Sequence, residues 1–283
     1  MGKSTQVVFW NIWGHRDSKG IHAFIRQHAS ITDIFCLTEV TDVADEYDSA
    51  LCFNADGTET PSQVNGCVQL KTEFSKMFTS TYTTAIRSDW VCSKTNRLFS
   101  GVGFGSMLLV KHGVQIEEVG TTLIEPDDQT HKSRAIQWIV YNKGATRVLV
   151  AHIHGLWIKD NTKGDHSERT QQSLIIRSTL KRIANFHGVQ KIIFGGDLNL
   201  DINTEAIAII ERGSSPNDMQ LRNLIAEHGI KNTRTKQYRK YADLKETKYA
   251  DYVFVSPAVK VGEFKVLNHV LASDHAPLMV QLS

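Results

Sequence analysis

The sequence predicts a mixed α/β (α+β) protein, and two observations carry this prediction. Short apolar runs rich in Val, Ile and aromatic residues recur along the 283-residue chain, and such runs are typical of sheet strands. Between many of them lie segments whose apolar residues recur at the helical period. Strands interleaved with helices are typical of folds in which helices cover β-sheets.

The expected strands are short and most of them are rich in β-branched and aromatic side chains. They cover residues 6–10, 34–37, 66–70, 106–110, 136–141, 147–152, 191–194, 252–255, 264–267 and 278–282. Hairpin-like pairs are expected over residues 106–119 and 134–152. The stretch 56–104 is polar and rich in Ser and Thr. Apart from the strand expected at 66–70, irregular or hairpin structure is expected there.

Helical periodicity marks four segments between these strands. Ser167 is a suitable N-cap for the second of them, and Gly213 and Gly229 are typical stops for the last two. The expected helices cover residues 19–29, 167–186, 203–212 and 217–228.

Length and charge bound the function only loosely. The chain is longer than most single domains, but two-sheet architectures often reach this length, so residues 1–283 are expected to form one domain. The net charge of +2 is too small to identify a polyanionic partner. Any attraction for phosphate groups must therefore come from local clusters of Lys and Arg.

The cysteines and the apolar runs exclude several other classes. No Cys-x-x-Cys spacing occurs, which argues against a zinc site or a disulfide framework, and Cys36 lies in an apolar strand as a buried thiol would. No apolar run approaches the roughly 20 residues that span a membrane. Residues 1–6 lack the apolar stretch of a signal peptide. We therefore expect a soluble, cytoplasmic protein without a membrane partner.

Polar groups gather where apolar strands end. Gly195-Gly196-Asp197-Leu198-Asn199 closes the strand at 191–194, and Ser273-Asp274-His275 precedes the last strand. Asp197 and Asn199 alternate across Leu198, so that in strand geometry both side chains face one cleft. Carboxylates, amides and histidines without cysteines suit a hard cation such as Mg²⁺, with Mn²⁺ as the alternative, and a phosphate substrate.

Six such clusters follow one another along almost the whole chain. They are Trp10-Asn11, Thr38-Glu39-Val40, His154-Gly155, Gly196-Asp197-Leu198-Asn199, Ala250-Asp251-Tyr252-Val253-Phe254 and Ser273-Asp274-His275. Their order and their residue identities resemble those of the endonuclease/exonuclease/phosphatase superfamily, whose fold is similar to that of deoxyribonuclease I. The resemblance implies a four-layer sandwich, in which two packed mixed β-sheets are flanked by helices and the active site lies at one end.

The resemblance also implies roles for the acidic and amide residues. Glu39, a carboxylate at the end of an apolar strand, is the expected metal ligand, with Asn11 beside it and Asp274 reaching the metal directly or through water. Asp197 would orient or deprotonate the attacking water, and Asn199 would bind the phosphate or hold that aspartate. The alternative for Glu39 is an ordinary solvated side chain.

Histidines complete the expected catalytic set. By resemblance His275 is the catalytic imidazole and Asp251 its carboxylate partner, which fixes the tautomer of the ring. His152 and His154 share one face of their strand. The His-Gly pairing favours His154 for contact with the phosphate or the leaving group, and leaves His152 as a core histidine, although the sequence does not decide between them.

Two further features bear on the substrate. Residues 231–248 hold seven Lys and Arg, among them Arg234, against two acidic residues, with Tyr238 and Tyr241 between them. This pattern suits phosphate contacts with stacking, and a solvated surface loop is the alternative. Trp157 lies three residues after His154 and would stack a base or a sugar, with packing in a core or cleft wall as the alternative.

These features together predict an Mg²⁺-dependent nuclease or phosphodiesterase acting on nucleic acid or nucleotides. A phosphomonoesterase acting on a small phosphorylated metabolite is the first alternative. The second is an inactive nucleic-acid-binding protein, which the joint presence of the acidic, amide and imidazole groups disfavours. The sequence leaves the oligomeric state open, and Trp13 stands where some nuclease relatives carry an acidic residue.

Overall fold

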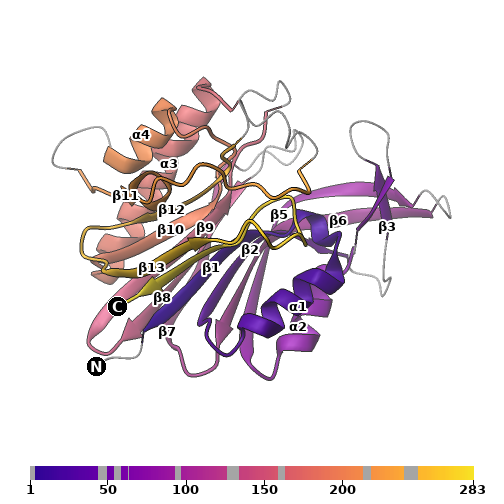
Figure 1. Ribbon diagram of the computed structural model, residues 1–283, viewed down its shortest axis with the longest axis horizontal. Coiled ribbons are helices and arrows are strands. Elements are labelled where there is room, and N and C mark those ends of the chain that lie inside the picture. Colours follow the sequence, from indigo (N-terminus) through magenta and orange to yellow (C-terminus); the bar gives the residue numbers. More distant parts are fainter. Residues whose placement is uncertain are drawn as a thin grey trace.

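The computed structural model describes residues 4–43, 50–53, 59–62, 64–92, 97–125, 134–158, 163–212, 218–238 and 248–283. Two six-stranded β-sheets pack face to face, and helices cover both outer faces (Figure 1). This arrangement confirms the predicted four-layer sandwich. Within the described residues, no helix is long and apolar enough to cross a lipid bilayer.

Both sheets are mixed, because each contains a single parallel pair among its described strands. The first sheet is formed, in order, by β13 (Val261–Val266), β14 (Leu278–Leu282), β1 (Thr5–Asn11), β2 (Ile34–Asp42), β6 (Arg97–Lys111) and β5 (Phe78–Cys92). The second contains β11 (Arg222–Asn223), β12 (Asp251–Val255), β10 (Lys191–Asp197), β9 (Thr146–His154), β8 (Arg134–Lys143) and β7 (Gln115–Glu125). The parallel pairs are β1–β2 and β9–β10.

Each outer face is covered by its own helices. The helices α1 (Ser18–His28) and α2 (Gly66–Phe74) lie on the first sheet, whereas α3 (Ser167–His187) and α4 (Glu205–Arg212) lie on the second (Figure 1). A short ribbon, β3 (Ala50–Phe53) with β4 (Glu59–Ser62), lies near the far ends of β5 and β6 (Figure 1). The remaining elements are η1 (Trp13–His15) and α5 (Leu224–Glu227).

The central strands are continuously apolar because both of their faces are buried. In β1, Val7 and Phe9 face the core between the two sheets, while Val8 and Trp10 belong to a second core that α1 and α2 close. Alternate side chains of a strand point to opposite faces. The same strand therefore contributes to two separate hydrophobic cores.

Three sequence-based expectations are wrong. The segment 66–70 was expected as a strand and is the first half of α2, in which Cys67, Leu70 and Phe74 are buried at helical spacing. A run of five residues is too short for its period to separate strand from helix. The helix expected over 217–228 is only α5, four residues long, and Asn223 caps it by accepting the N–H groups of Ile225 and Ala226; residue 217 lies outside the described residues.

The third wrong expectation is the hairpin over residues 106–119. Its two strands, β6 and β7, belong to different sheets, so the chain crosses from one sheet to the other there. The hairpin expected over 134–152 is confirmed, since β8 pairs with β9 in antiparallel register. The hairpin expected within 56–104 is confirmed as β5 and β6. Buried Cys36 carries a free thiol, as expected.

Candidate active site

A cavity of about 510 Å³ opens at the end of the sandwich where strands of both sheets terminate. Residues from both sheets and from the connecting loops line it. The acidic, amide and imidazole residues in its wall are Glu39, His154, Asp197, Asn199, Asp274 and His275. The basic and aromatic ones include Trp13, Arg16, Phe104, Arg134, Trp157, Lys163, Arg234 and Tyr238.

Strand register brings distant residues of the second sheet together. In the parallel pair β9–β10, His154 lies opposite Asp197, and in the antiparallel pair β10–β12, Asp197 lies opposite Asp251. Three functional side chains separated by up to 97 residues in the sequence therefore stand side by side on neighbouring strands. Leu198 and Asn199 follow the end of β10, and Asn199 has a left-handed backbone with φ of 53°.

Glu39 reaches the cavity from the first sheet through a β-bulge. It was expected at a strand end, whereas β2 continues to Asp42 and Glu39 occupies a bulge between Thr38 and Val40. Its φ of 59° is a conformation that residues other than glycine rarely adopt. A bulge re-aims a side chain without ending the strand, and here it directs the Glu39 carboxylate toward the cavity.

Asn11 joins the acidic residues of the two sheets. Its Nδ2 donates hydrogen bonds to Glu39 Oε1 at 2.9 Å and to Asp197 Oδ2 at 3.0 Å. Its Oδ1 accepts a hydrogen bond from the backbone N–H of Trp13 at 2.9 Å. The amide therefore holds the two carboxylates close together, and the Trp13 contact sets its orientation.

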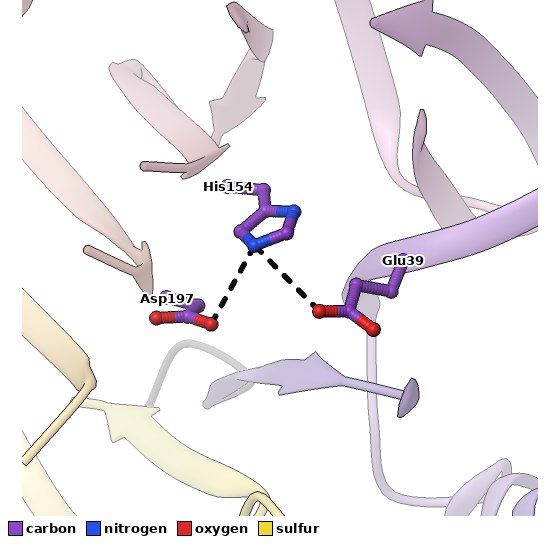
Figure 2. A group of neighbouring side chains, drawn as sticks. All are labelled: Glu39, His154 and Asp197. Atoms are coloured by element: carbon purple, nitrogen blue, oxygen red, sulfur yellow. Dashed lines mark ion pairs between the residues drawn. The ribbon is translucent and has the colours of Figure 1, made fainter. Parts of the chain in front are cut away.

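His154 lies between these two carboxylates (Figure 2). Its Nε2 is 3.6 Å from Glu39 Oε1 and 3.7 Å from Asp197 Oδ2. One donor atom from each of the three residues lies within 4.8 Å of the others, which is close enough for one metal ion. The two carboxylate oxygens of this group suit a hard divalent cation.

The protonation preferences of these groups fit a site for a cation. Burial raises the pKa of Glu39 to about 7, because an isolated carboxylate is poorly solvated there. Burial alone would also raise the pKa of Asp197, but His275, His154 and Arg234 hold it well below its ordinary value. Asp197 is thus a carboxylate at neutral pH, and Glu39 is a carboxylate that a cation would stabilise.

His275 is held on three sides at the base of the cavity. Its Nδ1 lies 2.8 Å from Asp251 Oδ2, and its carbonyl accepts a hydrogen bond from Trp10 Nε1 at 3.0 Å. The guanidinium of Arg234 donates to His275 Nε2 and to Asp274 Oδ2. Because guanidinium N–H groups only donate, Nε2 is the acceptor here and Nδ1 carries the proton shared with Asp251.

The surroundings of Asp274 and Arg234 differ from those expected. Asp274 pairs with Arg234 at 3.1 Å, and its carboxylate is outside the two groups of described residues that could hold a metal ion. Arg234 was expected to bind phosphate from a basic loop, with a solvated loop as the alternative; it is buried, lines the cavity and stacks on the ring of Tyr238 at 4.5 Å. Lys231, Lys236 and Lys248 are exposed, while Arg239, Lys240, Tyr241 and Lys245 of that loop lie outside the described residues.

The structure separates the two histidines of β9. His154 enters the cavity, whereas His152 is fully buried and bonds to Gln137 Oε1 at 2.9 Å. Gln137 in turn donates to the carbonyl of Thr81 on the other sheet. His152 therefore takes part in a buried polar link between the sheets, and Trp157 lies at the cavity wall with 52% of its surface exposed.

Sequence reasoning missed several cations of the cavity. Lys163 is buried, and its Nζ donates to the carbonyl of Tyr249 at 2.9 Å; burial, followed by the charge of Arg234, lowers its pKa to about 7. Arg134 is buried at the start of β8 and donates to the carbonyl of Gly155. Arg16 stacks on Trp13. None of the three stands in a recognisable motif, so no local signal could have identified them.

Gly196 yields a test of how tightly the backbone beside Asp197 is packed. Its φ is 126°, and a Cβ at this position would lie 2.2 Å from the carbonyl oxygen of Ile153. We expect Gly196→Ala to lower the free energy of unfolding by more than about 2 kcal/mol, because strain and a backbone clash add together. Urea unfolding of the purified variant measures this loss.

The matched control for this experiment is Gly144→Ala. Gly144 also has a positive φ, 61°, but a Cβ there meets nothing within 4 Å. It should cost only the conformational strain, about 1 kcal/mol. Equal losses in the two variants would contradict the close packing described for Gly196.

The comparison with family profiles identifies one family. The sequence profile described as the Endonuclease/Exonuclease/phosphatase family matches residues 8–275. The curated proteins contain no significant match to the chain.

Solved structures match over nearly the full chain. The human Nocturnin catalytic domain with bound sulfate anion is 16% identical with a TM-score of 0.65, and the match covers 100% of this chain and 95% of that one. A mannosyl-6-phosphatase of Bacteroides thetaiotaomicron is 17% identical with a TM-score of 0.64, covering 99% of both chains. Truncated Caenorhabditis elegans TDP2 is 17% identical with a TM-score of 0.61, covering 99% and 97%. At such identities these likenesses establish a shared fold.

Proposed function

Since this chain belongs to the endonuclease/exonuclease/phosphatase family, we propose that it is an Mg²⁺-dependent phosphoesterase that hydrolyses phosphodiester bonds in nucleic acid or nucleotides. The observation that carries the proposal is the convergence of Glu39, His154 and Asp197, with one donor atom of each within 4.8 Å of the others. His275 lines the same cavity, and buried Asp251 holds its ring through the 2.8 Å contact with Nδ1.

The metal would be held chiefly by Glu39, with Asp197 and Asp274 within the same wall and Asn11 behind it. The donors fit a hard cation because they are carboxylates already drawn together by one amide. When bound, the cation would neutralise charge on the non-bridging phosphate oxygens. Side chains of the protein would orient the attacking water and hold the phosphate.

Asp197 is the group we assign to the attacking water. Its carboxylate is fixed on two sides, because Oδ2 accepts from Asn11 Nδ2 and Oδ1 accepts from the backbone N–H of Asn199 at 2.9 Å. Its low pKa keeps it ionised, so it accepts a hydrogen bond from water and orients it. Asn199 lies in the same wall, and its amide would contact a phosphate oxygen.

The imidazoles and Arg234 would hold the phosphate. His154, at the end of β9, and His275, which precedes β14, line the cavity, and Asp251 fixes the ring of His275 by its 2.8 Å hydrogen bond. Arg234 places a permanent positive charge beside His275. Fixed donors and charges beside the space where negative charge increases in the transition state are the usual source of electrostatic stabilisation.

The cavity wall favours a nucleotide over a simple phosphate ester. Arg16 and Arg134 add positive charge beyond Arg234, and Trp157 exposes an aromatic surface in the cavity wall. Cations that contact phosphates and aromatic rings that stack bases are the usual components of single-stranded nucleic-acid sites. The neighbours carry printed names as different as Nocturnin, mannosyl-6-phosphatase and TDP2, so the shared fold alone does not choose a substrate.

A phosphomonoesterase acting on a small phosphorylated metabolite is the second candidate. The cavity volume of about 510 Å³ suits a small ligand. One structural neighbour is a mannosyl-6-phosphatase, although at 17% identity. This candidate needs no contact with a polymer outside the cavity.

Metal removal tests the proposal. The purified protein would be assayed with Mg²⁺ and then with EDTA on end-labelled single-stranded DNA, duplex DNA, RNA, and small phosphate mono- and diesters. We expect cleavage of a polymer or a nucleotide diester that EDTA abolishes, because the carboxylates alone repel the phosphate. Asp197→Ala serves as the inactive control.

The pattern of activity separates the candidates. Turnover of small monoesters alone would move the assignment to a phosphomonoesterase, and silence on all substrates would favour an inactive binding protein. For a polymeric substrate, binding should weaken steeply with salt, because each phosphate contact releases counterions. A flat salt dependence would contradict extended contact with a nucleic acid.

A further inference from the structure

We propose that Trp13 forms a nucleobase subsite of the active cavity, so that the preferred substrate carries a nucleoside next to the scissile phosphate. This inference rests on the proposed phosphoesterase function and adds the chemical class that the site selects. The turn that presents Trp13 is built by residues 12–16, which directly follow β1.

The backbone of this turn is held in an unfavourable conformation. Trp13, Gly14 and His15 have consecutive φ values of 52°, 62° and 60°, all in the left-handed region. A bulky residue there is a true outlier, since its Cβ crowds the backbone. In the described residues, the non-glycine residues with positive φ are Trp13, His15, Glu39 and Asn199. Three of these line the cavity and the fourth, His15, belongs to this turn.

Strain of this kind persists only where the surroundings over-determine it. The N–H of Trp13 donates to Asn11 Oδ1 at 2.9 Å, and the N–H of His15 donates to the carbonyl of Ile12 at 3.0 Å. The ring of His15 is fully buried beneath the turn, with its Nε2 at 3.1 Å from His22 Nε2 on α1. His22 in turn bonds to Glu73 of α2 at 2.5 Å.

The ring of His15 packs closely against the start of α2, at a position where only glycine leaves room for it. A Cβ added at Gly66, the first residue of α2, would lie 2.1 Å from His15 Nδ1. Two helices thus hold the turn from below, one through His22 and one through Gly66. The result is that the side chain of Trp13 is aimed by the protein core rather than left to a mobile loop.

Trp13 is placed next to the chemistry. Asn11, which accepts the backbone N–H of Trp13, also binds the carboxylates of Glu39 and Asp197, so the backbone of Trp13 is fixed directly to the proposed catalytic cluster. The guanidinium of Arg16 lies 4.2 Å from the centroid of the Trp13 ring, and both side chains line the cavity. An indole and a planar guanidinium together offer a flat, electron-rich and cationic surface on which a base can stack.

A purely structural role is a poorer account of Trp13. Trp10 provides the comparison within this chain, because it is 1% exposed, packs edge-on against Phe24 at 4.8 Å and donates to His275. Trp13 is only partly buried and faces the cavity. A tryptophan needed only for packing would not require a left-handed backbone at the mouth of a phosphate site.

Three substrates with one leaving group isolate nucleoside recognition. Methyl 4-nitrophenyl phosphate and the 5′- and 3′-(4-nitrophenyl) phosphates of thymidine all release 4-nitrophenolate, and they differ only in the alcohol that remains. We expect kcat/KM for the better thymidine ester to exceed that of the methyl ester by about 10-fold or more, the usual contribution of one stacked base.

The variant Trp13→Gly removes the ring and relieves the left-handed strain at once, so it should fold at least as well as the parent. We expect it to bring the thymidine-to-methyl ratio close to one, mainly by raising KM for the thymidine ester. The readout is the thymidine-to-methyl ratio, because a loss common to both esters, such as a shift of Asn11, cancels in it. Trp13→Phe keeps an aromatic face and should retain most of the ratio. Phe186→Ala, an aromatic that is 81% exposed on α3, is the matched control.

The outcomes are distinct for the two levels of the proposal. A wild-type ratio near one, or a ratio that Trp13→Gly leaves unchanged, would overturn the nucleobase subsite while the hydrolysis of both esters upheld the phosphoesterase. If neither ester is hydrolysed, binding measured by calorimetry still tests the nucleobase subsite. Thymidine 5′-phosphate should bind about 10-fold more tightly than ribose 5-phosphate, and only when Trp13 is present. Equal binding of the sugar phosphate would mean that the wall recognises sugars and would overturn the inference.

Discussion

Asp197→Asn is expected to lower kcat by about 1,000-fold or more while leaving the fold intact, because removing a positioned base costs up to several powers of ten. Asp197 is 1% exposed and joins Asn11, the N–H of Asn199, His154 and His275. An amide at this position keeps the volume but loses the negative charge that orients the water. It also removes one of the two carboxylates that Asn11 draws together.

Single-turnover kinetics at saturating Mg²⁺ would measure this loss, since saturation separates a defect in chemistry from weaker metal binding. The unfolding midpoint of the variant should stay within a few degrees of the parent. Glu263→Gln, which changes an exposed carboxylate of β13 paired with Lys265, is the control and should keep full activity. Near-normal turnover by Asp197→Asn would refute the site assignment.

The second large effect is expected at the His275–Asp251 pair. His275→Ala should lower kcat by about 100- to 10,000-fold. Asp251→Asn should lower it less, because Asp251 lies 2.8 Å from Nδ1 and acts by orienting the ring, whereas Nε2 faces the cavity side. The double variant should be no slower than His275→Ala alone, since two residues that act as a unit are not additive.

A double-mutant cycle on kcat measures that coupling. The exposed His112, replaced by Ala, controls for the general effect of losing an imidazole and should leave kcat unchanged. Independent, multiplicative losses would show that Asp251 acts on something other than His275, for example on Asp197, its partner across the β10–β12 register. That outcome would require a new role for Asp251.

The strands that carry the site were predictable from local composition. The central strands β1, β2, β9 and β10 are apolar on both faces because each lies between the opposite sheet and a helical layer. Such runs are visible without any knowledge of pairing. The residues that end them, Asn11, His154 and Asp197 among them, stand out because a polar group at the end of a buried strand needs a partner.

Other features depended on contacts that no local pattern encodes. The segment at α2 has too few residues for its period to be read, and its helical form follows from packing Leu70 and Phe74 against the first sheet. The crossing between β6 and β7 depends on which sheet each strand joins. The burial of Arg234 follows from its backbone bridge to His275, 41 residues away in the sequence.

By itself, the sequence determined the acidic, amide and imidazole residues of the candidate site, the strands that bear them and the family to which the chain belongs. Only the tertiary structure decided how those residues meet. The register of β9, β10 and β12 aligned His154, Asp197 and Asp251, the bulge in β2 turned Glu39 toward them, and the strained turn after β1 placed Trp13 at the rim. Periodicity reports which face of an element is buried, whereas register, bulges and left-handed turns arise from contacts between distant segments and leave no periodic trace in the chain.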